Sequence, residues 1–398
     1  MQTLKELYKI GKGPSSSHTM GPERAVKMFR SKFPDGDSYK AILYGSLSKT
    51  GAGHGTDRVI IDTFKPHKAE VVFDYKETDL FHENTLDLIC YKNKEEIGKK
   101  RFYSVGGGTI LVDGEAAAQV EIKYEHNSFH DIATFCKERN IRLSEYVFMH
   151  EDSDFKYYLY TVWEAMKNSI QEGLTTSGIL PGGLAVERKA QFLYNQRHID
   201  ESLSTRENRV VCSYAFAVSE QNAGGGTIVT APTCGACGVL PSVLKYMQEK
   251  KGFTDEDIIR ALAVGGLIGN LVKANASISG AECGCQAEIG TACSMASAAL
   301  TELFEMGIDQ IEYAAEMAME HHLGLTCDPI CGLVQIPCIE RNAVAAMRAI
   351  NALSLANFLS GTRKISFDVV VKTMYQTGKD LSYKYRETSD GGLATMYK

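Results

Sequence analysis

Three cysteines in the C-terminal half of the chain lie among carboxylates, amides and prolines rather than in hydrophobic stripes. Cys285, Cys327 and Cys338 occur in the segments GCQAEIG, LTCDPICG and IPCIERNA. Thiolates presented by separate loops can bind a metal centre, whereas thiols scattered through apolar stripes usually only fill space. Three thiolates are one short of a closed tetrahedral site or a fully ligated iron–sulfur cube, and the open position is where a substrate can bind.

The spacing of the cysteines matches no standard metal or redox motif. The separations between Cys285, Cys327 and Cys338 fit neither a zinc finger nor a zinc ribbon, and the closely spaced run of a bacterial ferredoxin is absent. Cys234 and Cys237 form a C-x-x-C pair, but their surroundings predict helices instead of the βαβ unit of a thioredoxin-like site. From spacing alone, an iron–sulfur cluster and buried structural thiols both stay open.

A hydroxyl-rich loop precedes the first predicted helix. Ser15, Ser16, Ser17, His18 and Thr19 form a continuous run between two Gly-Pro pairs. Hydroxyls, backbone N–H groups and the positive end of a helix together favour the binding of an anion such as a carboxylate. A polar N-terminal cap of the helix is the alternative interpretation.

A second loop holds a histidine between glycines, in the segment TGAGHGTD. His54 has Gly53 and Gly55 on its two sides, so its ring can approach a ligand without interference from neighbouring side chains. A turn with an incidental histidine is the alternative. Together with the serine loop, His54 indicates a polar binding site.

The elements that must position these residues divide the chain into two parts. The first part has predicted strands over residues 39–46, 70–75, 101–105 and 109–112. A helix is predicted over residues 23–32 with Pro22 in its first turn, and another after Gly55 with Thr56 or Asp57 as its cap.

Residues after 131 show a helical pattern almost everywhere. The longest predicted helices cover residues 154–172, 206–221, 239–250, 255–274, 286–304, 310–322 and 339–359. Helices 255–274 and 286–304 are apolar all round, which predicts a central, buried position. The predicted fold class is therefore α+β, with a small N-terminal α/β sandwich-like domain (residues 1–127) and a large all-helical C-terminal domain (residues 128–398).

Composition narrows the possible partners and location. The chain has 398 residues, 44% of them apolar and 23% charged, with a net charge of −6. No basic block suited to nucleic acid is present, and no apolar stretch reaches the roughly 18 residues of a membrane span. The N-terminal segment MQTLKELYKIGKG lacks the apolar run of a signal peptide. These features predict a cytoplasmic protein without a nucleic-acid or membrane partner, in a compartment that disfavours disulfides.

The longest motifs, taken in order, resemble those of the iron–sulfur L-serine dehydratases, also called L-serine ammonia-lyases. They are GPSSSHTMGP, YGSLSKTGAGHGTD, TAPTCGACGVLPSVL, NASISGAECGCQAEIG and MEHHLGLTCDPICGLVQIPCIERNA. The resemblance covers both predicted domains, in the single-chain arrangement with the smaller β domain first and the α domain second. It implies a 4Fe–4S cluster held by Cys285, Cys327 and Cys338. It also implies a substrate site at Ser15–Thr19 and His54, and a homodimer.

The chain departs from the family pattern at several thiols. It has TAPTCGACG and CDPICG where the family often has TAPTNGAAG and CDPxGG, so Cys234, Cys237 and Cys331 are extra thiols near the implied site. Some relatives carry a cysteine at the extreme C-terminus that can cover the open iron. This chain has no cysteine after Cys338, so any such plug must be a different group.

The resemblance implies the conversion of L-serine to pyruvate and ammonia, with the open iron as Lewis acid. The Ser15–Thr19 loop would hold the substrate carboxylate, and His54 is the expected general base, with His18 and Lys273 as rivals. No lysine signature of a pyridoxal-phosphate enzyme is evident. The alternatives are a related lyase acting on L-threonine or L-cysteine, a non-enzymatic iron–sulfur sensor, and a protein with a structural zinc site.

Overall fold

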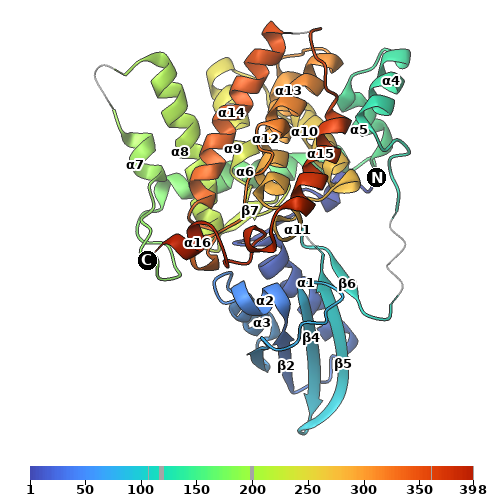
Figure 1. Cartoon of the computed structure of the whole chain (residues 1–398), viewed down its shortest axis with the longest axis vertical. Helices are drawn as coiled ribbons and strands as arrows, with labels where there is room; N and C mark the ends of the chain where they lie inside the picture. Colours follow the sequence, from blue (N-terminus) through green and yellow to red (C-terminus); the bar gives the residue numbers. More distant parts are fainter. Residues whose placement is uncertain (106, 116–120, 198–200, 360, 398) are drawn as a thin grey trace.

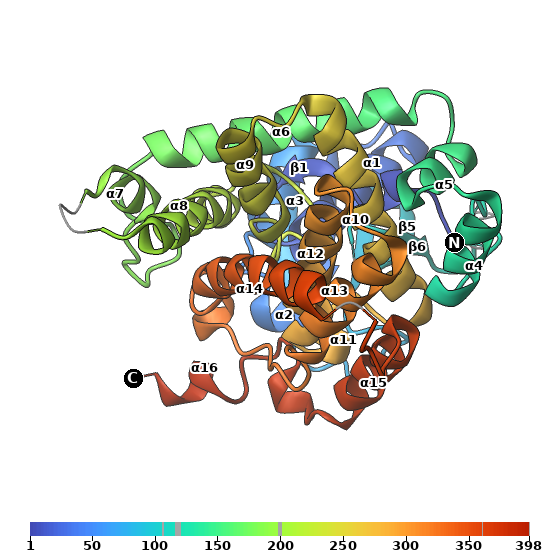
Figure 2. The same ribbon diagram turned by 90° about the horizontal axis from the view of Figure 1, so that it is seen from above.

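The computed structural model describes residues 1–105, 107–115, 121–197, 201–359 and 361–397. A five-stranded sheet with two covering helices lies below a large body of helices in Figure 1, and Figure 2 shows the helical body from above. This architecture confirms the predicted α+β class. Gly106, between the predicted strands 101–105 and 109–112, lies outside the described residues.

The small sheet has the strand order β3-β2-β4-β5-β6. The strands are β2 (Ser38–Leu43), β3 (Lys68–Phe73), β4 (Thr85–Lys92), β5 (Glu95–Ser104) and β6 (Ile110–Val112). Strands β2 and β3 are parallel and the other pairs are antiparallel. The parallel pair needs a crossover connection, which α3 (Thr56–Phe64) provides.

Two helices cover one face of this sheet. Helix α1 (Gly21–Lys32) has Pro22 in its first turn, as predicted, and it packs beside α3. Phe29 of α1 makes edge-on contacts with Tyr39 and Phe102 of the sheet, and all three side chains are buried. The small region therefore has a hydrophobic core of its own.

The helical body surrounds one central helix. Its helices of eight or more residues are α4 (Phe129–Arg139), α5 (Leu143–His150), α6 (Phe155–Thr175), α8 (Leu203–Ala223), α9 (Val239–Lys251), α10 (Asp255–Asn275), α12 (Thr291–Leu303), α13 (Ile308–Glu320), α14 (Cys338–Phe358) and α15 (Phe367–Asp380). The shorter ones are α7 (Ala190–Asn195), α11 (Gly280–Cys283) and α16 (Leu393–Met396). Every residue of α12 is buried among α9, α10, α13 and α14 (Figure 2). Helix α10 packs directly against α12 and is buried throughout residues 261–272, so the prediction that both helices are buried is confirmed.

The N-terminal segment ties the two regions together. Leu4, Leu7 and Tyr8 are buried in the core of the helical body, where the Tyr8 hydroxyl donates to the carbonyl oxygen of Leu262 at 2.9 Å. Strand β1 (Ile10–Lys12) then pairs antiparallel with β7 (Thr227–Val229). Because the serine loop follows β1 and the TAPTCGACG loop follows β7, this strand pair places the two loops next to each other. The predicted domain boundary between residues 127 and 128 stays a prediction.

Three local predictions need correction. Strand β2 ends at Leu43, because Gly45 takes a left-handed φ of 54° and begins α2 (Gly45–Thr50). Gly55, with a φ of 64°, is the N-cap of α3 in place of Thr56 or Asp57. The Thr56 hydroxyl has another partner, described below. Strand β4 and helix α15 were not among the predicted elements.

The described helices include none whose length and apolar character would suit a membrane span.

Candidate active site

A small cavity of about 20 Å³ lies where the N-terminal region meets the helical body. Segments far apart in the chain line it. Its walls include Ser15, Ser16, His54, Gly235, Cys285, Glu288, Cys327, Cys338 and Glu387. Both groups of residues that the sequence singled out, the hydroxyl and histidine loops and the three cysteines, therefore meet at one place.

The serine loop forms a single π-helical turn, Ser16–Met20, directly before α1. The Ser15 hydroxyl accepts a hydrogen bond from the backbone N–H of His18 at 3.0 Å, and the Ser15 carbonyl accepts from Thr19 and Met20. Gly13 permits this placement, since a Cβ there would come within 2.3 Å of the backbone oxygen of Asn222. Ser15 and Ser16 face the cavity, as the anion-site prediction requires.

The other hydroxyls of the loop support the histidines. Thr19 donates from its hydroxyl to the carbonyl oxygen of His54 at 2.9 Å, and it lines a neighbouring groove. Ser17 lies within hydrogen-bonding distance of His18 Nδ1, at 2.8 Å. Thr56 donates to the carbonyl oxygen of His18 at 2.6 Å. The loop and the His54 turn are therefore held to each other by side-chain hydrogen bonds.

His18 is fully buried and both of its ring nitrogens have partners. Nδ1 faces Ser17, and Nε2 lies 3.0 Å from the hydroxyl of Ser46. Its ring contacts that of His54, with 4.5 Å between centroids. The pKa of His18 lies well below its usual value, mainly because the ring is buried and to a smaller extent because His54 is close. The structure thus places His18 behind His54, where it supports the ring.

His54 has one free nitrogen directed at the cavity. Its Nδ1 donates to the carbonyl oxygen of Thr50 at 3.0 Å, and a carbonyl can only accept, so Nε2 carries the lone pair. Nε2 is buried without a hydrogen-bond partner among the described residues, 3.9 Å from Glu387 Oε1. Burial lowers the pKa of His54 to about 4, so the ring is neutral at neutral pH. A neutral imidazole with a free lone pair can accept a proton.

Lys273, the third predicted candidate for the base, is not brought to the cavity. Its Nζ donates to Gln2 Oε1 at 3.1 Å and to the carbonyl oxygen of Glu6 at 3.2 Å. The pKa of Lys273 is lowered to about 8, mainly by burial and to a smaller extent by the charge of Lys9. The lysine therefore anchors the N-terminal segment to α10.

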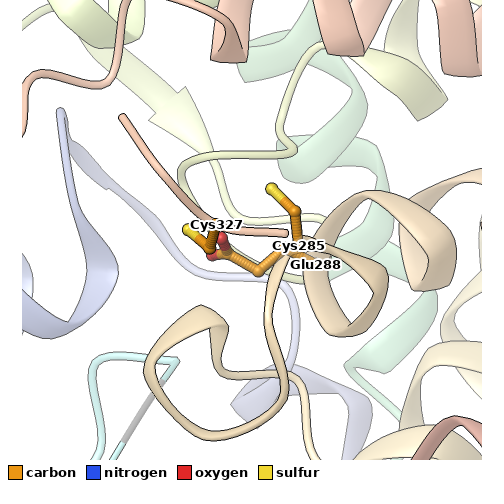
Figure 3. Close-up of side chains that lie close together, drawn as sticks. All are labelled: Cys285, Glu288 and Cys327. Carbon is orange, nitrogen blue, oxygen red and sulfur yellow. The ribbon is translucent and has the colours of Figure 1, made fainter. Parts of the chain in front are cut away.

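The thiols come from three different settings. Cys285 precedes a π-helical turn that leads into α12, and Cys338 is the first residue of α14. Cys327 lies in an extended segment that bridges to Arg386. The Cys285 and Cys327 sulfurs and a Glu288 carboxylate oxygen all lie within 4.8 Å of one another, and Figure 3 shows these side chains gathered together. Cys338 lines the same cavity.

One arginine is the cation beside these thiols. Arg341 donates to the carbonyl oxygen of Thr326 at 2.6 Å and to Asp328 Oδ1 at 3.1 Å. The pKa of Cys285 lies below its usual value, mainly because of a hydrogen bond with Cys327 and to a smaller extent because of the Arg341 charge. The hydrogen bond with Cys285 and burial raise the pKa of Cys327, and burial raises that of Cys338.

These three thiols fit a metal centre because the cavity is short of positive charge. Metal ligation requires thiolates, and a buried thiolate is costly without a nearby cation. Among the described residues, Arg341 is the cation that acts on Cys285, Cys338 and the Glu288 carboxylate, and it is already bound to Asp328. All eleven cysteines are free, so no disulfide uses the three thiols. A metal or iron–sulfur centre would supply the missing positive charge.

The extra thiols lie outside the cavity wall. Cys234 and Cys237 are buried in a separate apolar cluster with Tyr214 and Val218. Burial raises the pKa of both thiols. Cys331 is exposed and lines the neighbouring groove. Geometry therefore separates the three cavity cysteines from the extra ones, a distinction that motif spacing could not make.

Comparison with known proteins identifies the family of this chain. The serine dehydratase alpha chain family matches residues 84–394, and the serine dehydratase beta chain family matches residues 3–65. The chain belongs to the serine dehydratase family. It is 40% identical to the L-serine dehydratase of Haemophilus influenzae, with 99% of both chains covered. It is 38% identical to the L-serine dehydratase of Streptomyces coelicolor, with 98% of this chain and 97% of the relative covered.

In this member of the serine dehydratase family, a larger groove leads up to the cavity. The groove has a volume of about 630 Å³ and shares Pro14, His54 and Val334 with the cavity wall. Arg58 and Lys12 also line it. The groove therefore lies directly beside the cavity, with the buried His54 between the two spaces.

The sequence did not single out two carboxylates of the site as functional. Glu288 accepts a hydrogen bond from the Thr233 hydroxyl at 2.7 Å, and burial raises its pKa. It stands three residues after Cys285, and that spacing was its only signal. Glu387 lies in the C-terminal segment RETSDGG, where no pattern marked it.

Proposed function

We propose that the protein is an iron–sulfur-dependent L-serine ammonia-lyase, which converts L-serine to pyruvate and ammonia. The observation that carries this proposal is a single buried cavity that holds three thiols, two serine hydroxyls and a neutral histidine with a free lone pair. The relatives' name, L-serine dehydratase, supports the same reaction. The predicted cytoplasmic location and homodimer accompany the proposal as predictions.

Cys285, Cys327 and Cys338 would hold a 4Fe–4S cluster. When bound, such a cluster supplies a Lewis-acidic iron with an open coordination position for the substrate hydroxyl. The cavity also keeps the reacting groups away from bulk water, because each of its three thiols is buried.

The hydroxyl and histidine loops would bind the substrate carboxylate and remove the α-proton. Ser15 and Ser16, at the N-terminal end of a helix, bind the substrate carboxylate and reduce the electrostatic cost of a carbanion beside it. His54 Nε2 accepts the α-proton while Thr50 holds the ring in place through Nδ1. Loss of the β-hydroxyl as water leaves 2-aminoacrylate, whose imine tautomer takes up water and gives pyruvate and ammonia.

The test is an anaerobic preparation assayed for pyruvate, with iron measured in the same sample. We expect brown protein with about four iron atoms per chain, active on L-serine and inactivated by air. Restoration by Fe(II) with a thiol would support the cluster assignment. A colourless, iron-free protein that still forms pyruvate would contradict it. Competition by L-threonine and L-cysteine in the same assay decides between the related substrates.

A further inference from the structure

The C-terminal segment holds Glu387 over the cavity through backbone hydrogen bonds. The Glu387 N–H donates to the Cys327 carbonyl oxygen at 2.8 Å, and the Cys327 N–H donates to the Tyr385 carbonyl oxygen at 2.8 Å. Further along, the Leu393 N–H donates to Asp328 Oδ2 at 2.8 Å. Glu387 itself has a left-handed φ of 57°, which a non-glycine residue adopts only when its surroundings enforce it. These backbone contacts fix the position of the Glu387 side chain at the cavity.

The Glu387 carboxyl group faces the cavity without a basic partner. Within the described residues, no lysine or arginine forms an ion pair with it, and its Oε1 lies 3.9 Å from Nε2 of the neutral His54 ring. A buried carboxylate is costly unless a cation accompanies it. No lysine or arginine in the described part of the chain supplies that cation.

The substrate that the site would take has one group still without a partner. Ser15 and Ser16 account for the carboxylate, His54 for the α-proton, and the three thiols for the metal that receives the hydroxyl. The α-ammonium group remains, and it is bonded to the same carbon that gives up its proton to His54. Glu387 is the carboxylate closest to His54 Nε2 among the described ion pairs.

We propose that Glu387 binds the α-ammonium group of the substrate and so selects amino acids over hydroxy acids. This inference rests on the proposed function, because it takes an L-α-amino acid as the ligand. Glu387 is therefore a specificity-determining residue, and the C-terminal segment is part of the substrate site.

The experiment compares L-alanine with propionate, two non-reacting ligands that differ only in the amino group. Binding of each is measured by calorimetry on anaerobic, iron-replete protein, for the natural chain and for Glu387→Gln. We expect the substitution to weaken L-alanine binding about 10- to 100-fold, the range of a charge-assisted hydrogen bond, and propionate binding less than about twofold. Glu387→Asp, which keeps the charge, should recover part of the L-alanine affinity.

Asp390→Asn is the matched control, because Asp390 lies in the same segment but faces Lys49 at 3.8 Å. Its L-alanine affinity should equal that of the natural chain. The inference is wrong if Glu387→Gln weakens both ligands equally, weakens neither, or lowers the iron content, since the last result would make Glu387 a cluster ligand. L-alanine binding by a protein that forms no pyruvate would refute the proposed reaction and leave the ammonium site standing.

Discussion

The two sides of the cavity satisfy their polar groups in different ways. We call Ser15–Thr19 together with residues 50–56 the hydroxyl wall, and Cys285, Glu288, Cys327, Cys338 and Glu387 the thiol wall. In the hydroxyl wall, side chains and carbonyls bond to one another, and His54 Nε2 is the atom left free toward the cavity. In the thiol wall, several acidic groups gather around one arginine.

This difference shows which wall depends on a bound centre. A network whose hydrogen bonds are complete is rigid before any ligand arrives, which suits the orientation of a substrate and a base. Buried thiolates and carboxylates, by contrast, are stable as anions only when a cation joins them. The hydroxyl wall should therefore keep its structure without metal, whereas the thiol wall should not. Each prediction below tests one side of this contrast.

The largest effect is expected from the thiol wall. Cys285→Ala, Cys327→Ala and Cys338→Ala should each abolish iron retention and pyruvate formation, since each removes one of three ligands. Iron analysis, the visible spectrum and the anaerobic assay check this on the same samples.

Cys234→Ala is the matched control for these variants. Cys234 is as deeply buried as the three cavity cysteines but lies in the separate apolar cluster. Its iron content should match that of the natural chain. Equal loss of iron from Cys234→Ala and Cys338→Ala would show that the ligand set has been misassigned.

The next largest effect is expected at the free atom of the hydroxyl wall. His54→Ala should lower kcat about 10²- to 10⁴-fold, the usual contribution of a positioned general base. Iron content should be unchanged, because His54 belongs to the opposite wall. Steady-state kinetics with iron quantification checks both statements. Near-normal turnover would remove His54 from the role of base.

The contrast also explains what could be predicted from the sequence. The long helices were evident because their apolar periodicity is local, and the burial of α12 followed from its lack of a polar face. The hydroxyl wall was recognisable because Ser15–Thr19 are contiguous. Spacing could not show that Cys285, Cys327 and Cys338 converge, since their approach depends on how α12 and α14 pack. The family motifs supplied that link.

Other parts of the site carried no local signal. Glu387 reaches the cavity only because the C-terminal segment pairs with Cys327, a contact between residues 60 positions apart by chain number. The role of Thr56 was mistaken because a threonine before a helix usually acts as a cap. Here Gly55 takes the cap position, which frees the Thr56 hydroxyl to donate to the carbonyl oxygen of His18.

Acid should lower the free energy of unfolding through the buried His54 of the hydroxyl wall. The pKa of His54 is about 4 in the folded chain and ordinarily about 6.5, so between these values the unfolded chain takes up a proton that the folded chain does not. The contribution of His54 to the free energy of unfolding is therefore fully present above pH 6.5 and is lost as the pH falls toward 4. This one ring accounts for roughly 3 kcal/mol, at about 1.4 kcal/mol per pKa unit.

Unfolding midpoints measured across this pH range check the prediction. His54→Gln should flatten the loss of stability, because its amide can still donate to the Thr50 carbonyl but does not titrate. His130→Gln is the control, since His130 is exposed at the start of α4. Identical pH profiles for the two variants would mean that the acid sensitivity arises elsewhere in the chain.

The smallest effect is expected from one internal hydrogen bond of the hydroxyl wall. Thr56→Val keeps the shape of the side chain but leaves the buried carbonyl oxygen of His18 without its 2.6 Å donor. The loss should be about 1–3 kcal/mol of unfolding free energy. Thr362→Val, which removes an exposed hydroxyl that donates to the Leu359 carbonyl, should cost less than about 0.5 kcal/mol. If denaturation in the absence of iron shows the two variants to be equal, the hydroxyl wall is not the self-supporting side of the cavity.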